Sequence, residues 1–251
     1  MCEETSAVTV CGGPADRRRR RRSRPDTDAI RPDSTASRRV CFLGDSLVLG
    51  VGDPTERGWV GRMPGLAAGA GIDLTSYNLG VRGQTMPMIA ERFSEVLVRL
   101  PYPVRGRLVV SGGINDADLE GGRVRSAASE SVAALDELLR MSASAGIDTL
   151  VVSPTPVADV GHRQRLEGLS QAFSVLAEAR SVPYADVMSL LSASSEWGRE
   201  MADGDGYHPS APGYRHLAEA VWYAGMRRWL TRDCASGVVS LRRVGEEWAD
   251  E

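Results

Sequence analysis

This 251-residue chain has no lysine, no closely spaced cysteine pair and no apolar run long enough to span a membrane. It has no lysine, so all 30 basic residues are arginine, and with the abundant alanine and glycine we attribute this to coding bias rather than to chemistry. Its 4 cysteines include no CxxC pair and no metal-ligand spacing, which argues against a cysteine-based metal site and favours a reducing compartment. No apolar run approaches the roughly 20 residues of a membrane span. The remaining composition, with 42% hydrophobic residues, is typical of one globular domain.

Positive charge is concentrated near the N-terminus. The first forty positions hold ten arginines and six acidic residues, about +4, and the rest of the chain is acidic. Residues 1–38 are polar without periodicity and predict a disordered extension. Its run Arg17–Arg22 is better explained as a solvated tail, or a misassigned start, than as a nucleic-acid tether. No apolar signal core follows these arginines, so we expect a cytoplasmic protein with neither membrane nor nucleic acid as partner.

From position 39 onward, short apolar runs of β type alternate with longer segments of helical periodicity. The expected strands are Val40–Leu43, Leu74–Asn78, Arg107–Ser111, Thr149–Ser153 and Pro183–Val187. The expected helices are Gly58–Ala70, Met86–Leu100, Arg123–Ala145, Arg163–Arg180 and Ala211–Leu230, the last with Ser210 as N-cap. This alternation predicts an α/β three-layer sandwich with a five-stranded parallel sheet. We expect this domain to span residues 39–231 and residues 232–251 to form a tail.

Polar residues follow the predicted strands at positions suited to catalysis. Ser46 follows the first strand, Gly80 the second and Asn115 the third, whereas Asp205 and His208 precede the last helix. In parallel sheets, ligands bind beyond the carboxyl ends of the strands, so we expect these residues to meet there. A hydroxyl, a glycine amide, a carboxamide, a carboxylate and an imidazole are the groups that acyl transfer by a serine nucleophile requires.

These residues also have simpler explanations when each is taken alone. Ser46 is suited to capping the following helix, and Gly80 to a backbone conformation with positive φ. A divalent metal ion held by Asp203, Asp205 and His208 is a further alternative, which the lack of a second ligand cluster disfavours. The occurrence of all the groups in chain order favours the catalytic interpretation.

Four sequence blocks occur in the order found in a known family. They are Gly44–Leu47 (GDSL), Gly80, Gly113–Asp116 (Gly-x-Asn-Asp) and Asp205–His208 (Asp-x-x-His). With these blocks the chain resembles the GDSL-type, or SGNH, hydrolases over about residues 39–231. The resemblance implies a flavodoxin-like sheet, a serine esterase or acylhydrolase that cleaves carboxylic acyl esters or thioesters, and no cofactor or metal ion. An ordinary α/β-hydrolase is disfavoured, because its Gly-x-Ser-x-Gly motif requires glycine where Val48 stands.

The hypothesis assigns a role to each polar residue. Ser46 is the expected nucleophile and needs the imidazole of His208 as its base. Asp205 precedes His208 by three positions, so its carboxylate is placed to hold the other ring nitrogen protonated. The resemblance assigns the oxyanion donors to the backbone N–H groups of Ser46 and Gly80 and the side-chain amide of Asn115. Such donors typically contribute about 3–4 kcal/mol each.

Substrate selection is expected to fall to the loops around these blocks. Four residues of these loops are candidates for a modest apolar acyl pocket: Trp59, Met86, Pro156 and Val157. Asp45 and Asp116 are expected to hold loops through hydrogen bonds to the backbone. No inserted lid is visible, so a small-molecule ester with a short acyl group is the expected substrate. Two alternatives stay open: an acyltransferase that uses the same triad, and a non-catalytic binding protein.

Overall fold

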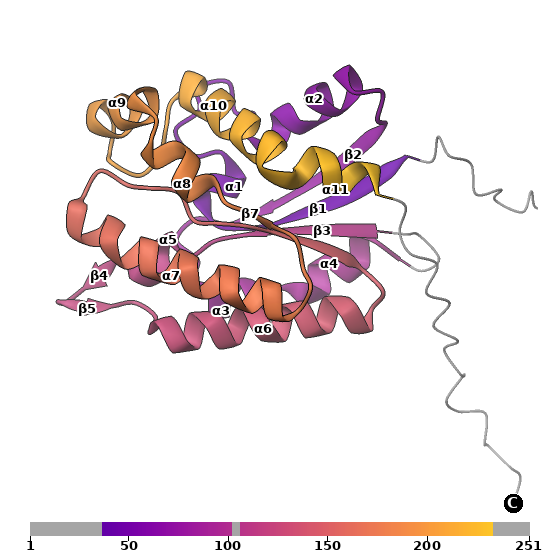
Figure 1. Cartoon of the computed structure of the whole chain (residues 1–251), viewed down its shortest axis with the longest axis horizontal. Coiled ribbons are helices and arrows are strands. Elements are labelled where there is room, and N and C mark those ends of the chain that lie inside the picture. Colours follow the sequence, from indigo (N-terminus) through magenta and orange to yellow (C-terminus); the bar gives the residue numbers. More distant parts are fainter. Residues whose placement is uncertain (1–36, 102–105, 233–251) are drawn as a thin grey trace, which may run out of the picture. The chain divides into compact units, whose positions relative to one another are not determined.

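The computed structural model describes residues 37–101 and 106–232, which build a parallel sheet with helices on both faces (Figure 1). The strands are β1 (Arg38–Gly44), β2 (Leu74–Gly80), β3 (Gly106–Ser111), β6 (Asp148–Val152) and β7 (Tyr184–Ala185). They lie in the order β2-β1-β3-β6-β7, and every neighbouring pair is parallel. The predicted α/β fold with a five-stranded sheet is confirmed. The predicted N-terminal extension and C-terminal tail lie almost entirely outside the described residues.

The central strand β1 shows why the sheet needs a helical layer on each face. Its side chains alternate, so Val40 and Phe42 enter one hydrophobic core, and Cys41 and Leu43 enter the other. All four side chains are completely buried. A strand that is buried on both faces needs a continuous run of apolar residues, and β1 has one at positions 40–43.

Two groups of helices cover the sheet (Figure 1). The core of Val40 and Phe42 is covered by α2 (Met63–Gly69), α8 (Val187–Ser192), α9 (Ser195–Asp203), α10 (Ala211–Val221) and α11 (Arg227–Thr231). The core of Cys41 and Leu43 is covered by α3 (Met86–Glu91), α4 (Phe93–Arg99), α6 (Ala128–Ser144) and much of α7 (Val160–Ala179). Short helices α1 (Ser46–Leu49) and α5 (Ile114–Ala117) directly follow β1 and β3.

Several predicted helices are divided by local backbone geometry. The segment 86–100 breaks at Arg92, whose φ and ψ of −90° and 10° separate α3 from α4. The last helix is interrupted by a π-helical turn, Trp222–Met226, between α10 and α11. A 3₁₀ turn, Val60–Arg62, precedes α2. Val187, predicted as the end of the last strand, instead begins α8, and α9 occupies a segment for which the sequence predicted no element. Asp186 and Ser194 cap the N-termini of these two helices.

A short antiparallel hairpin replaces the predicted start of the helix at Arg123. Its strands are β4 (Leu119–Glu120) and β5 (Arg123–Val124). Gly121 and Gly122 connect them with φ values of 59° and 79°, a conformation that glycine adopts readily. Helix α6 therefore starts only at Ala128.

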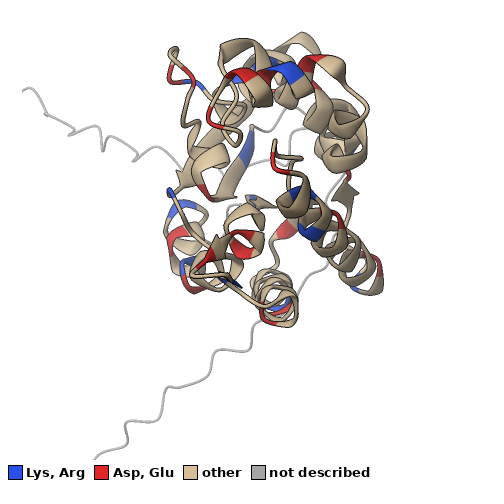
Figure 2. Cartoon of the chain, turned by 90° about the vertical axis from the view of Figure 1, so that its left-hand side faces the viewer, with Lys and Arg blue, Asp and Glu red and all other residues tan. Residues whose placement is uncertain are grey.

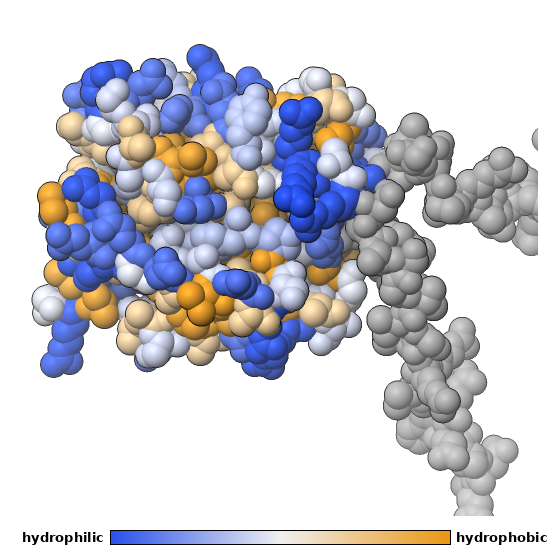
Figure 3. All heavy atoms as spheres, viewed as in Figure 1, coloured by the Kyte–Doolittle hydropathy of each residue, from blue (hydrophilic) through white to orange (hydrophobic). Residues whose placement is uncertain are grey.

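The surface in view in Figure 3 is a mosaic of hydrophilic residues with scattered hydrophobic patches. Among the helices of residues 37–101 and 106–232, none has the length and apolar character needed to cross a bilayer.

Candidate active site

The turn after β1 presents Ser46 at the carboxyl edge of the sheet. Ser46 is the first residue of α1, and Asp45 caps this helix by accepting a hydrogen bond from the backbone N–H of Leu47 (3.0 Å). A Cβ atom on Gly44 would lie 2.1 Å from the carbonyl oxygen of Ser111 in β3, so the close strand pairing requires glycine there. The helix α5 and the β4–β5 hairpin lie at the same edge, on the left in Figure 1. Figure 2 shows this side of the molecule facing the viewer, with acidic and basic residues interspersed.

Three side chains form a continuous series of hydrogen bonds. His208 Nε2 lies 2.8 Å from Ser46 Oγ, and His208 Nδ1 lies 2.7 Å from Asp205 Oδ2. The other carboxylate oxygen of Asp205 accepts hydrogen bonds from the backbone N–H groups of Tyr207 (2.9 Å) and His208 (2.8 Å). A carboxylate at Nδ1 favours the tautomer that is protonated there, which leaves Nε2 free to accept a proton from the serine hydroxyl.

The charge on Asp205 is maintained by the same contacts. Partial burial acts to raise its pKa, but the hydrogen bonds from His208 and Tyr207 outweigh it, so the pKa of the carboxyl lies below its usual value. Asp205 is therefore ionised at neutral pH and able to stabilise an imidazolium ion on His208.

The residues of the metal alternative do not gather around one point. Asp203 ends α9, whereas Asp205 and His208 are hydrogen-bonded to each other. Across residues 37–101 and 106–232, no three His, Cys, Asp or Glu side chains are grouped so as to hold a metal ion.

Gly80 differs from its predicted role as an oxyanion donor. Its backbone N–H already donates a hydrogen bond to Asn78 Oδ1 (2.9 Å), and the amide of Asn78 is in turn held by the carbonyl oxygen of Val48 (2.8 Å). A Cβ atom at position 80 would lie 2.1 Å from the backbone nitrogen of Leu49. Glycine is thus required here by the close packing of β2 against α1, and its amide is not free for a substrate.

The loop after β2 offers another amide, that of Gly83. Gly83 has a φ of 73°, and open space surrounds the position that a Cβ would occupy. Within the part of the chain that the structure describes, its N–H has no hydrogen-bond acceptor. The next carbonyl, that of Gln84, accepts a hydrogen bond from Asn115 Nδ2 (3.0 Å), so Gly83 lies beside the predicted carboxamide donor. The predicted site did not include Gly83, whose signal in the sequence is the second glycine of Gly-Val-Arg-Gly.

The four predicted pocket residues lie in two different places. Trp59 and Met86 are each 1% exposed; Trp59 packs edge-to-face on Phe42 in the core, with ring centroids 5.4 Å apart. Both belong to the hydrophobic cores and leave almost no surface for a substrate to contact. Pro156 and Val157 border a cavity of about 470 Å³ next to α7, α8 and α9, and none of the three hydrogen-bonded site residues lines it.

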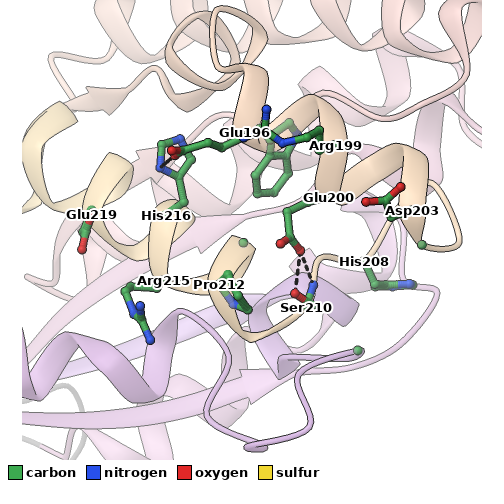
Figure 4. Close-up of a pocket in the computed structure, with 14 residues that line it drawn as sticks. Glu196, Arg199, Glu200, Asp203, His208, Ser210, Pro212, Arg215, His216 and Glu219 are labelled. Carbon is green, nitrogen blue, oxygen red and sulfur yellow. Dashed lines mark hydrogen bonds and ion pairs between the residues drawn. The ribbon is translucent and has the colours of Figure 1, made fainter.

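A larger groove of about 690 Å³, which no pattern in the sequence predicted, reaches His208 from between α9 and α10 (Figure 4). Six of its lining residues have charged side chains, namely Glu196, Arg199, Glu200, Asp203, Arg215 and Glu219, and His216 also lines it. Glu200 Oε2 accepts hydrogen bonds from the backbone N–H (2.8 Å) and hydroxyl (2.7 Å) of Ser210. Ser210 occupies the predicted N-cap position of α10, but no hydrogen bond from its side chain caps the helix.

Two buried carboxyl groups support the site, as expected. Asp116 accepts hydrogen bonds from the backbone N–H of Met86 (3.0 Å) and the hydroxyl of Ser131 (2.6 Å), which ties α5 to α3 and α6. Asp45, beside Ser46, is only 2% exposed, and burial raises the pKa of its carboxyl to about 7.

Asp45→Asn is expected to remove a pH-dependent loss of stability. Because the folded-state pKa of Asp45 exceeds the usual 3.8, its stabilising contribution is complete below about pH 4 and is lost as the pH rises through about 7. Asparagine keeps an acceptor for Leu47 N–H and cannot ionise. Between pH 4 and 8, the free energy of unfolding of the variant should therefore rise relative to that of the wild type, by at most about 4 kcal/mol. Thermal unfolding over this pH range measures the difference. Parallel curves for the two proteins, like those expected for the exposed control Asp73→Asn, would contradict this assignment.

The fold and the hydrogen-bonded hydroxyl, imidazole and carboxylate define an α/β sandwich with a candidate catalytic centre at the carboxyl ends of its strands. The family profile of the GDSL-like Lipase/Acylhydrolase family matches residues 42–216, and the chain belongs to this family of esterases and acylhydrolases. No curated protein sequence matches the chain significantly.

Solved structures with the same fold share little sequence with this chain. A lipase/acylhydrolase from Enterococcus faecalis is 23% identical and has a TM-score of 0.62; the match covers 73% of this chain and 93% of that one. The psychrotrophic esterase EstA from Pseudoalteromonas sp. is 20% identical (TM-score 0.62; 78% and 100% covered). The acetylxylan esterase Axe2 from Geobacillus stearothermophilus is 18% identical (TM-score 0.60; 80% and 98% covered). At these identities the likeness concerns the fold alone.

Proposed function

We propose that this protein is a serine esterase that hydrolyses carboxylic acyl esters or thioesters through an acyl-enzyme on Ser46. The observation that carries the proposal is the continuous hydrogen bonding from Ser46 Oγ through His208 to Asp205, with both distances below 3 Å. A serine hydroxyl is almost inert at neutral pH unless a base removes its proton during attack. His208 Nε2 is already at hydrogen-bond distance from that proton.

The reaction follows from this arrangement. As Ser46 Oγ attacks the substrate carbonyl, its proton passes to His208 Nε2, and Asp205 stabilises the imidazolium that forms. The carbonyl oxygen becomes an oxyanion, for which we assign three donors: the backbone N–H groups of Ser46 and Gly83 and the side-chain amide of Asn115. As the first residue of α1, Ser46 has no intrahelical acceptor for its N–H. His208 then protonates the leaving group. In the second half of the reaction, a water molecule gives its proton to His208 and attacks the acyl-enzyme, and His208 returns a proton to Ser46 Oγ as the free acid leaves.

The surroundings of His208 favour a small polar substrate. The leaving group departs next to this histidine, and the groove that reaches it is lined mainly by polar and charged side chains. Such a lining suits a hydrated alcohol such as a sugar hydroxyl better than a long hydrocarbon chain. A structural neighbour, Axe2, is named as an acetylxylan esterase, which is consistent with a short acyl group on a polar alcohol.

A substrate panel with chemical labelling tests the proposal. The purified full chain is offered acyl esters and thioesters of increasing chain length, with alcohols, amines and sugars present as acceptors. We expect the highest kcat/KM for short acyl groups, free acid as the main product, and modification of Ser46 by a fluorophosphonate that mass spectrometry locates. EstA was crystallised with a phosphonate inhibitor, which supports this choice of probe. Transfer of most of the acyl group to one acceptor would instead identify an acyltransferase, and no turnover or labelling would contradict catalysis.

A further inference from the structure

Arg125, directly after β5, connects two separate loops of the candidate site. One guanidinium nitrogen donates a hydrogen bond to Asn115 Oδ1 (3.2 Å), and the other donates to the carbonyl oxygen of Gly83 (2.8 Å). The Arg125 side chain is only 24% exposed, which protects both hydrogen bonds from much of the competition with water. The two residues that it joins are those that supply two of the three assigned oxyanion donors.

The hydrogen bond to Asn115 determines which way the carboxamide faces. A guanidinium has only donors, so it selects the oxygen end of the amide. The nitrogen end must then face away from Arg125, where one of its hydrogens is donated to the carbonyl oxygen of Gln84 (3.0 Å). The second hydrogen remains for a substrate oxyanion. Without Arg125, a rotation of the amide by 180° would place an acceptor where a donor is needed.

The hairpin explains how Arg125 reaches this position. The backbone N–H of Arg125 donates to the carbonyl oxygen of Asp118 (3.0 Å), and that of Ser126 donates to the carbonyl oxygen of Asp116 (3.1 Å). These bonds anchor the returning strand of the hairpin to the end of α5, which carries Asn115. The acidic neighbour Glu120 lies 3.9 Å from Arg125 and is 84% exposed, so it competes only weakly for the guanidinium.

We propose that Arg125 is a positioning residue of the oxyanion hole, which orients the Asn115 amide and restrains Gly83. This inference rests on the proposed esterase function. Arg125 does not touch the reacting atoms itself; it acts through residues that interact with the oxyanion in the transition state. Its loss should therefore lower kcat and leave KM nearly unchanged.

A double-mutant cycle tests this inference with short-chain esters. Asn115→Ala should lower kcat about a hundredfold, and Arg125→Met about tenfold or more, with KM within about twofold in both cases. In the Asn115→Ala background, Arg125→Met should cost less than about threefold, since the amide that it orients is gone. Equal losses from Arg125→Met in both backgrounds would overturn the orientation of the Asn115 amide by Arg125.

Two further variants separate orientation from charge and from folding. Arg125→Lys keeps the positive charge but cannot span both acceptors, so we expect it to recover little of the loss; full recovery would show that charge alone matters. Arg123→Met, an exposed arginine of the same hairpin, serves as control and should retain wild-type kcat and melting temperature. If Arg125→Met does not fold, the cycle is run with Arg125→Lys. An inactive wild type would refute the proposed function, whereas an active wild type with unchanged Arg125 variants would refute only this inference.

Discussion

Ser46→Ala is expected to lower kcat/KM for activated esters by about 10⁴-fold or more. The hydroxyl of Ser46 is the group that carries the acyl chain in the proposed mechanism, and alanine removes the proton that His208 would accept. Alanine is tolerated at the start of α1, so the melting temperature should change little. Steady-state kinetics and calorimetry check these two expectations together.

Chemical labelling gives an independent reading of the same variant. A fluorophosphonate should modify the wild type and fail to modify Ser46→Ala. Ser129→Ala, an exposed serine on α6, is a matched control and should keep both activity and labelling. Persistent labelling of Ser46→Ala would show that another residue is the nucleophile.

Asp205→Asn is expected to lower kcat by about 10³- to 10⁴-fold with little change in KM. One side-chain oxygen can still accept the backbone hydrogen bonds from Tyr207 and His208. The new amide nitrogen would then face Nδ1 of His208, which favours the tautomer protonated at Nε2. That tautomer cannot accept the proton of Ser46, although the geometry of the loop is preserved.

The exposed Asp73→Asn serves as control for this substitution and should behave as the wild type. Prolonged chelation should also leave the wild-type activity unchanged, since Asp205 is assigned to the imidazole of His208 and not to a metal ion. Activity that is lost on chelation and restored by a divalent cation would reverse this assignment.

The features that could be predicted from the sequence depend on residues close together in the chain. Alternating apolar and helical patterns were enough for the five-stranded α/β fold, because buried parallel strands must be apolar on both faces. Asp205 and His208 are three positions apart, so one loop brings them together, and Asp45 holds the turn next to it through a hydrogen bond to the backbone. The cap of α1 is Asp45, whereas the sequence offered Ser46 for that role. Features of this kind can be predicted because they need no contact between residues far apart in the chain.

Apolar character alone did not distinguish a pocket residue from a core residue. Trp59 and Met86 satisfied the composition of an acyl pocket, yet the helices packed around them remove both from the surface. The groove beside His208 could not be predicted from the sequence either. It exists only where α9 lies against the start of α10, and the sequence predicted no helix at the position of α9.

The assembly of the site itself depends on tertiary structure. Ser46 and His208 are separated by 162 positions and meet only because the loops at the carboxyl edge of the sheet converge. The sequence by itself determined the fold class and the chemical groups available, since periodicity and residue type are local properties. Only the tertiary structure decided which glycine amide has no acceptor among the described residues, Gly83 rather than Gly80, and placed Arg125 against Asn115, because a hydrogen bond is assigned by distance in space.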